Sequence, residues 1–196
     1  MFAVTATAID RDDPLAGLTL GDRPEPTAPP GWEIVEVRAA ALNHHDLWTL
    51  RGVGIDPERL PIVLGCDASG VTAEGAEVVV HAVIAAPDGG DETLSGDFSI
   101  LSERVDGTFA ERLAVPRRNL VAKPAALSFE EAACLPVAWL TAYRMLFTRA
   151  GLRPGERVLI HAAAGGVGSV GVQLAKSLGA TVIGTASGRN EDFVRG

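Results

Sequence analysis

The chain has 196 residues, of which 47% are hydrophobic and 21% charged, a composition typical of a soluble globular protein with one large or two modest domains. Its net charge of −8 argues against nucleic acid or an anionic membrane as the main partner. No apolar run approaches the roughly 18 residues that a membrane span needs. The two cysteines, Cys66 and Cys134, lack metal-ligand spacing. Because the N-terminus also lacks a secretion signal, we expect a reduced, cytoplasmic protein.

The first part of the chain, to about residue 124, is predicted to be β-rich. Short apolar or alternating runs alternate with turn-rich stretches, a pattern that favours a small barrel or sandwich. One short helix is expected at His44–Arg51, and Pro87–Gly96 is expected to be an exposed loop. The predicted strands are Phe2–Ile9, Glu33–Leu42, Gly70–Thr72, Glu77–Ile84 and Phe109–Val115.

The second part begins with a predicted helix. Ser128 is a good N-cap, and two acidic residues follow it in the first turn, near the positive end of the helix dipole. Pro136 is expected to kink or divide this helix, and Gly151 to end it.

A βαβ unit is predicted next. The run RVLIHA is typical of a strand buried on both faces. In the following helix, Val167, Val170, Leu174 and Leu178 share one face, and Gly179 closes it. TVIGTA is a second buried-strand run, so the two strands should be parallel.

The turn between the first strand and the helix has the spacing A-x-G-x-x-G, with Ala163 at the first glycine position of a dinucleotide-binding fingerprint. Gly165 and Gly166 would let the backbone approach a pyrophosphate, which would face the N–H groups at the helix start near Val167. Gly168 would let the helix pack closely on the strand. The alternative is a purely structural glycine turn.

The end of the second strand distinguishes NAD from NADP. NAD sites place an acid there to bind the ribose 2′-hydroxyl, but this chain has Gly184–Arg189 without an acid. Ser187 could donate a hydrogen bond to a 2′-phosphate and Arg189 could pair with it, so NADPH is favoured over NADH. Alternatively, Arg189 is a solvated surface charge.

The ordered set of motifs resembles the medium-chain dehydrogenase/reductase superfamily, which includes zinc-type alcohol dehydrogenases and quinone oxidoreductases. The motifs are ALNHHDLWTLRG, LPIVLGCDASGV, DGTFAERLAVPRRNLVAKP, LSFEEAACLPVAWLTAYRML and HAAAGGVGSVGVQLAKSLGATVIGTAS. The resemblance implies a mixed fold. A GroES-like β-barrel domain over residues 1–124 would be followed by a partial α/β Rossmann domain over residues 125–196.

The zinc ligands of the alcohol dehydrogenases are replaced here. By motif alignment their first Cys falls on Asn43, their His on Cys66, the neighbouring Glu on Asp67 and the second Cys on about Val137. A zinc site needs at least three protein ligands, so no metal ligands are assigned and zinc is not expected. The four-cysteine structural-zinc lobe is also missing. The alternative is an unusual site made by Cys66, Asp67 and His44 or His45.

Without zinc, the resemblance implies an NADPH-dependent quinone oxidoreductase or enoyl reductase that transfers hydride to a quinone or an α,β-unsaturated carbonyl. Asn43 and Thr141 match family positions near the nicotinamide, whereas His45, Asp46 and Tyr143 are candidate proton donors among which no spacing selects. The alternative is a structural role, in which His44–His45 is a capping or surface pair and Asp46 fixes the start of the helix.

The family's Rossmann domain has six strands, and the chain ends just after the second. We therefore expect a fragment, a truncated product or a piece completed by another chain, with weak cofactor binding and a homodimer only at full length. Two alternatives stay open: a zinc-type alcohol dehydrogenase with divergent ligands, and a non-catalytic GroES-like binding module.

Overall fold

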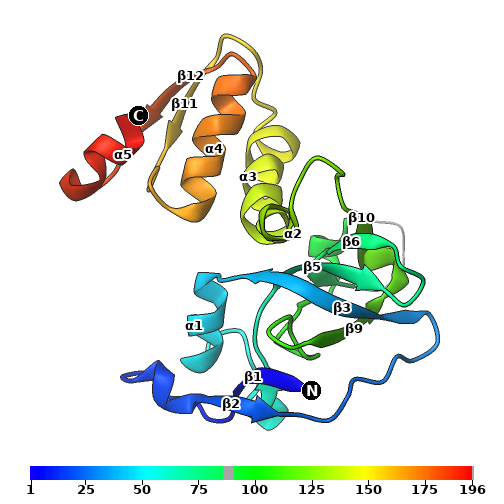
Figure 1. Ribbon diagram of the computed structural model, residues 1–196. Helices are drawn as coiled ribbons and strands as arrows, with labels where there is room; N and C mark the ends of the chain where they lie inside the picture. Colours follow the sequence, from blue (N-terminus) through cyan, green and yellow to red (C-terminus); the bar gives the residue numbers. More distant parts are fainter. Residues whose placement is uncertain (86–90, 196) are drawn as a thin grey trace. The chain divides into compact units, whose positions relative to one another are not determined.

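The computed structural model describes residues 1–85 and 91–195 and divides into two compact units, Met1–Pro136 and Val137–Gly196. In the first unit, two antiparallel sheets form most of the fold (Figure 1). The smaller has the order β2-β1-β4, with β1 at Phe2–Ala6, β2 at Leu18–Asp22 and β4 at Ile62–Val63. The larger has the order β10-β6-β5-β3-β9. Its strands are β3 (Trp32–Ala41), β5 (Asp67–Thr72), β6 (Glu77–Val80), β9 (Arg112–Pro116) and β10 (Leu120–Ala122).

The core of the larger sheet is built from β-branched and leucine side chains that alternate along its strands. Val35, Val80, Leu113 and Val115 are all at most 2% exposed and pack against Leu101 from a neighbouring loop. Burying such side chains contributes roughly 1.5–3 kcal/mol each. This core holds β5 in place, and the start of β5 carries the residues of the candidate site described below.

The predicted strand over Glu77–Ile84 is two strands, β6 and β7 (Val83–Ile84), and the single-strand prediction is wrong. The Asn119 amide donates to the carbonyl oxygens of His81 (2.8 Å) and Val83 (2.6 Å), so β7 leaves the sheet and pairs with β8 (Ser99–Ile100) instead. The sequence also missed the short strands β2, β4, β8 and β10. Of the predicted loop Pro87–Gly96, residues 87–90 lie outside the described part, and Glu92–Leu94 form a 3-10 turn.

The helix α1 spans His44–Leu50, as predicted. Short 3-10 turns lie elsewhere in the described part of this unit, at Pro14–Gly17, Pro57–Arg59, Glu92–Leu94 and Arg117–Asn119. The predicted cap at Ser128 is confirmed, because its hydroxyl accepts from the Glu131 N–H (3.2 Å) while the Glu131 carboxylate accepts from the Ser128 N–H (2.9 Å). This cap starts α2 (Phe129–Ala133), and the Ser69 hydroxyl on β5 donates to the Phe129 carbonyl.

Pro136 divides the helical segment, as predicted. After α2 the backbone is π-helical over Leu135–Trp139, α-helical in α3 (Leu140–Tyr143) and π-helical again over Arg144–Arg149. The missing N–H of proline and the bulk of its ring break the regular i to i−4 pattern.

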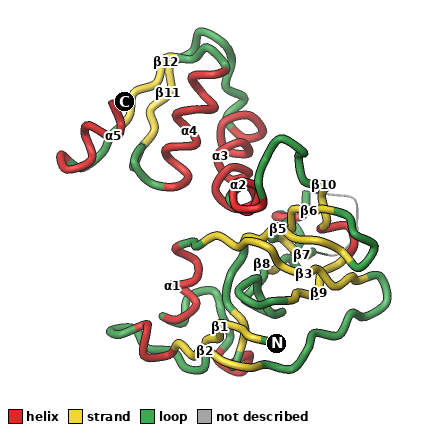
Figure 2. The backbone as a smooth tube through the Cα atoms, viewed as in Figure 1, coloured by secondary structure: helices red, strands yellow, loops and turns green. Residues whose placement is uncertain are grey.

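The second unit contains the predicted βαβ arrangement (Figure 2). Strand β11 (Arg157–Ile160) pairs in parallel with β12 (Thr181–Gly184), and α4 (Gly166–Ser177) connects them. After a 3-10 turn at Gly188–Asn190, α5 (Glu191–Arg195) follows. The predicted parallel pairing is confirmed, and Gly179 ends the helix region with a positive φ of 88°.

Burial of these strands on both faces is not observed. Leu159 and Ile183 are each 54% exposed. The helix α4 packs on one side of the pair, where a Cβ on Gly171 would lie 3.5 Å from Ile160, but no described element covers Leu159 and Ile183. Among the helices of residues 1–85 and 91–195, none has both the length and the hydropathy of a membrane span.

Candidate functional site

The first element of the site is the N-terminus of α1, where Asn43 is the N-cap residue with an extended backbone. The Asn43 N–H donates to Oδ2 of Asp46 (2.7 Å), which fixes the first turn of the helix. The Asn43 side-chain amide donates from Nδ2 to Oδ2 of Asp67 (2.8 Å). Because an ionised carboxylate only accepts hydrogen bonds, this contact turns the amide nitrogen toward Asp67 and the amide oxygen away from it.

The start of β5 brings Cys66 and Asp67 to this turn. Gly65 precedes them with a φ of 97°, and a Cβ on it would clash with the Thr108 hydroxyl and approach the Phe109 ring to 2.5 Å. Only glycine combines this conformation with this close approach. Gly65 therefore allows the chain to turn sharply so that two buried residues, Cys66 and Asp67, face α1.

Cys66 is fully buried and lies between a ring nitrogen and a carbonyl oxygen. Its Sγ is 3.3 Å from Nδ1 of His45 and 3.3 Å from the Leu101 carbonyl oxygen. Burial, followed by the negative charge of Asp46, raises the pKa of the Cys66 thiol far above its ordinary value. A nucleophilic role for Cys66 is therefore disfavoured, since the thiolate is the reactive form of cysteine.

His45 is held from both sides. Its Nε2 lies 3.1 Å from Oε1 of Glu103, and its Nδ1 faces Cys66 and, at 3.5 Å, the Ser102 hydroxyl. The His45 side chain is only 12% exposed. The interpretation of His44–His45 as a surface pair therefore fails for His45, because the loop that carries Ser102 and Glu103 encloses its ring.

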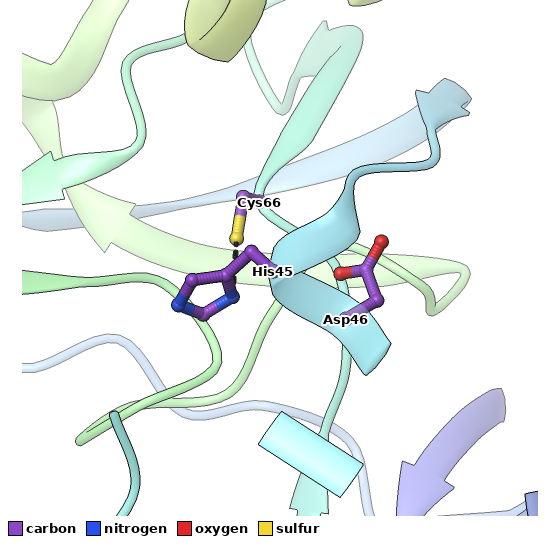
Figure 3. A group of neighbouring side chains, drawn as sticks. All are labelled: His45, Asp46 and Cys66. Carbon is purple, nitrogen blue, oxygen red and sulfur yellow. Dashed lines mark hydrogen bonds between the residues drawn. The ribbon is translucent and has the colours of Figure 1, made fainter. Parts of the chain in front are cut away.

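Asp46 is buried and has one oxygen, Oδ1, without a hydrogen-bond partner. Burial raises its pKa, although the hydrogen bond from the Asn43 N–H and the nearby His45 act in the opposite direction. Ligand atoms of His45, Asp46 and Cys66 lie within 4.8 Å of one another. Figure 3 shows the His45 ring pointing toward the Cys66 sulfur, with Asp46 extending from the other side of the α1 ribbon.

The second candidate region is the glycine turn of the second unit. The Ala163 N–H donates to the Thr185 carbonyl (2.9 Å), so this turn lies next to the end of β12. Gly165 is the N-cap of α4. A Cβ on Gly168 would clash with the Ala162 carbonyl, which is the close helix–strand approach expected of this glycine. By contrast, a Cβ on Gly166 would meet nothing closer than 4.0 Å.

Four further candidate residues belong to the second unit: Thr141, Val167, Ser187 and Arg189. Val167 is half-buried and the other three are exposed. Ser187 and Arg189 follow β12 on its 3-10 turn, and Thr141 lies on α3.

The structure thus brings Asn43, His45 and Asp46 together with Cys66 and Asp67. Sequence reasoning missed Glu103, which lies 58 residues from His45 along the chain. No local motif marks it, because a single Glu in a polar loop is ordinarily a solvated charge.

Comparisons with known proteins agree with this architecture. The family described as "Alcohol dehydrogenase GroES-like domain" matches residues 29–125. Crotonyl-CoA carboxylase/reductase from Cereibacter sphaeroides is 36% identical over 188 residues, covering 83% of this chain and 43% of that protein.

Two solved structures are also similar. A NAD-dependent alcohol dehydrogenase superimposes with a TM-score of 0.89 at 39% identity, covering 97% of this chain and 59% of that one. The quinone oxidoreductase of Thermus thermophilus, also solved in complex with NADPH, gives 0.72 at 35% identity, with coverages of 95% and 54%. The chain therefore spans well under two thirds of these relatives.

Proposed function

The chain belongs to the medium-chain dehydrogenase/reductase superfamily. We propose that it forms part of an NADPH-dependent reductase, which acts on a quinone or an α,β-unsaturated carbonyl without zinc. The relatives support the general class, since they include an alcohol dehydrogenase, a quinone oxidoreductase and a crotonyl-CoA carboxylase/reductase. Full-length assembly as a homodimer and a cytoplasmic location are proposed with it.

The observation that carries the zinc-independent proposal is the contact between Asn43 and Asp67. Asn43 stands where the zinc enzymes have their first cysteine ligand, and its amide is already committed to Asp67 at 2.8 Å. Val137, at about the position of the second cysteine, has no donor atom in its side chain. Zinc in proteins is bound by Cys, His, Asp or Glu, so this donor set does not reproduce the family's ligand set.

The second unit fits a dinucleotide. A twelve-residue helix, α4, begins at the glycine turn, and its first N–H groups and its dipole favour a pyrophosphate. Gly166 leaves open space where a side chain would otherwise stand. Ala163, Gly165, Gly166, Val167 and Gly168 would form this cradle, and a bound NADPH would supply the hydride.

NADPH is preferred to NADH because Ser187 and Arg189 are exposed at the end of β12, where NAD enzymes place an acid. One similar structure is NAD-dependent and another was solved with NADPH. The relatives therefore do not distinguish NADPH from NADH, and the preference for NADPH rests on Ser187 and Arg189 of this chain.

In the proposed reaction the residues of α1 bind and orient the reactants. Asn43, with its amide nitrogen on Asp67, would present its oxygen to a hydrogen-bond donor such as a carboxamide N–H. His45 and Asp46 are the proposed proton-handling groups, and Thr141 the proposed contact to the cofactor. Hydride addition to a conjugated carbonyl leaves an enolate, which then takes up one proton.

The test is a combined metal and cofactor measurement on the full-length protein. We expect less than about 0.1 zinc per chain, tight binding of NADPH by Trp fluorescence, and NADPH oxidation with a quinone or an enone. About one tightly bound zinc per chain, with oxidation of alcohols, would instead support the second candidate, a zinc-type alcohol dehydrogenase with divergent ligands. The proximity of His45, Asp46 and Cys66 favours that candidate.

A further inference from the structure

The segment Ser99–Glu103, which begins in β8, holds the Glu103 carboxylate in one orientation. Its Oε2 accepts from the Ile100 N–H (2.9 Å) and lies 3.4 Å from the Ser99 hydroxyl. The other oxygen, Oε1, is left to face His45 at 3.1 Å. Gly54 keeps this place open, because a Cβ there would lie 3.2 Å from Oε1. The carboxylate is therefore directed at one nitrogen of one imidazole.

Glu103 and Cys66, which face the two ring nitrogens of His45, differ in protonation state. Burial alone would raise the pKa of Glu103, but the hydrogen bonds from His45 and the Ile100 N–H outweigh it and lower that pKa. Glu103 is thus ionised near neutral pH and can only accept, so the proton must lie on Nε2 of His45. The thiol of Cys66 keeps its own proton, because burial and the charge of Asp46 raise its pKa. That proton is donated to the Leu101 carbonyl oxygen, and Nδ1 of His45 faces the Cys66 sulfur at 3.3 Å and the Ser102 hydroxyl at 3.5 Å.

We propose that Glu103 is a positioning residue, which selects the Nε2–H tautomer of His45 and thereby fixes the first turn of α1 against the start of β5. Two contacts join these segments side by side, His45 to Cys66 (3.3 Å) and Asn43 to Asp67 (2.8 Å). Glu103 supports the His45–Cys66 contact by binding the other ring nitrogen of His45, and the Asn43–Asp67 contact sets the direction of the Asn43 amide. The effect of Glu103 on catalysis, by way of Asn43, rests on the proposed reductase function.

A matched control lies in the same unit. His81 also points Nε2 at a glutamate, Glu92, at 2.9 Å, and both side chains are only partly exposed. This second pair has the same chemistry as the first but contacts neither α1 nor Cys66 in any hydrogen bond of the described residues. Glu92→Ala therefore removes an equivalent histidine–glutamate contact, together with the Glu92–Arg118 ion pair (3.9 Å), without touching the site.

The first experiment is NMR of the full-length protein with ¹⁵N-labelled histidine, which distinguishes protonated from unprotonated ring nitrogens. We expect His45 to carry its proton on Nε2 in the wild type and in Glu103→Gln, whose amide oxygen still accepts from Nε2. In Glu103→Ala we expect a mixture of tautomers, and in Glu92→Ala no change at His45. An Nδ1–H tautomer in the wild type, or unchanged His45 signals in Glu103→Ala, would overturn the proposal.

The second measurement is steady-state kinetics on the same variants. Glu103→Ala should lower kcat about tenfold, because small displacements of a positioned group are costly, with KM for NADPH within about twofold. Glu103→Gln should restore most of kcat, and Glu92→Ala should match the wild type. An unchanged kcat in Glu103→Ala, despite mixed tautomers, would overturn the link to catalysis.

Metal analysis separates this inference from a metal site. A zinc ion bound to Nδ1 and lost in Cys66→Ser would show that His45 is a ligand, and the proposal would be wrong. If the wild type has the expected tautomer but reduces neither quinones nor enones, the proposed function fails while the positioning of His45 by Glu103 stands.

Discussion

The two candidate regions of the molecule are built in opposite ways. The glycine turn occupies six consecutive residues, Ala163–Gly168, and its geometry follows from the strand before it and the helix after it. The polar cluster of the first unit comprises Asn43, His45, Asp46, Cys66, Asp67 and Glu103. These residues come from the start of α1, the start of β5 and the loop before β9. A contiguous site can be predicted from local spacing, whereas a dispersed one depends on which loops the sheet brings together.

The difference also appears in how each region satisfies its polar groups. The turn presents backbone N–H groups, which any compatible sequence would offer. The cluster relies on particular side chains, and each member, apart from one oxygen of Asp46, has a partner inside it. Substitutions should therefore act on ligand binding in the turn and on geometry or ionisation in the cluster.

The largest expected effect is in the turn. Gly166→Ala adds a Cβ with nothing closer than 4.0 Å in the protein, so the fold should tolerate it, but the methyl group would stand where the pyrophosphate is proposed to bind. We expect NADPH affinity to fall about 100-fold by calorimetry. The melting temperature should stay within about 2 °C of the wild type.

Gly21→Ala, at a site on β2 that is equally open, is the control for that variant and should bind normally. Unaltered affinity in Gly166→Ala would mean that the turn is purely structural.

A smaller effect is expected at the end of β12. Arg189→Ala should weaken NADPH about tenfold, since a charged hydrogen bond to phosphate contributes roughly 1.5 kcal/mol or more. NADH, which lacks the 2′-phosphate, should be affected less than about twofold. Competitive titration of both cofactors measures this, and an equal loss for the two would remove the argument for NADP.

The smallest expected effect concerns ionisation in the cluster. Burial raises the pKa of Asp46 above its unfolded value, so the folded state favours the protonated form. Its contribution to stability is present below the unfolded pKa and is lost as pH rises through the folded pKa. Asp46→Asn has no such loss, so it should gain stability relative to the wild type as pH rises above about 4.

Urea denaturation across this pH range measures the difference. The exposed Asp97→Asn serves as control and should follow the wild type throughout. A gap between Asp46→Asn and the wild type that narrows as pH rises would contradict burial as the cause.

Residue patterns alone were enough to predict much of the fold. The cap at Ser128, the break at Pro136 and the parallel βαβ unit all follow from local rules, because capping, proline geometry and apolar periodicity act over a few residues. The split of Glu77–Ile84 into β6 and β7 was not predictable in this way, since it depends on Asn119, which lies 38 residues beyond His81 along the chain.

The sequence by itself determined the family resemblance, the glycine turn and the replacement of the zinc ligands by Asn43, Cys66 and Val137. Only the tertiary structure decided the partners of those residues. Asp67 faces Asn43, and Glu103 encloses His45, because the positive φ of Gly65 turns β5 toward α1 and the loop before β9 folds over the imidazole. Such contacts join residues with no fixed spacing along the chain, so no sequence pattern encodes them locally.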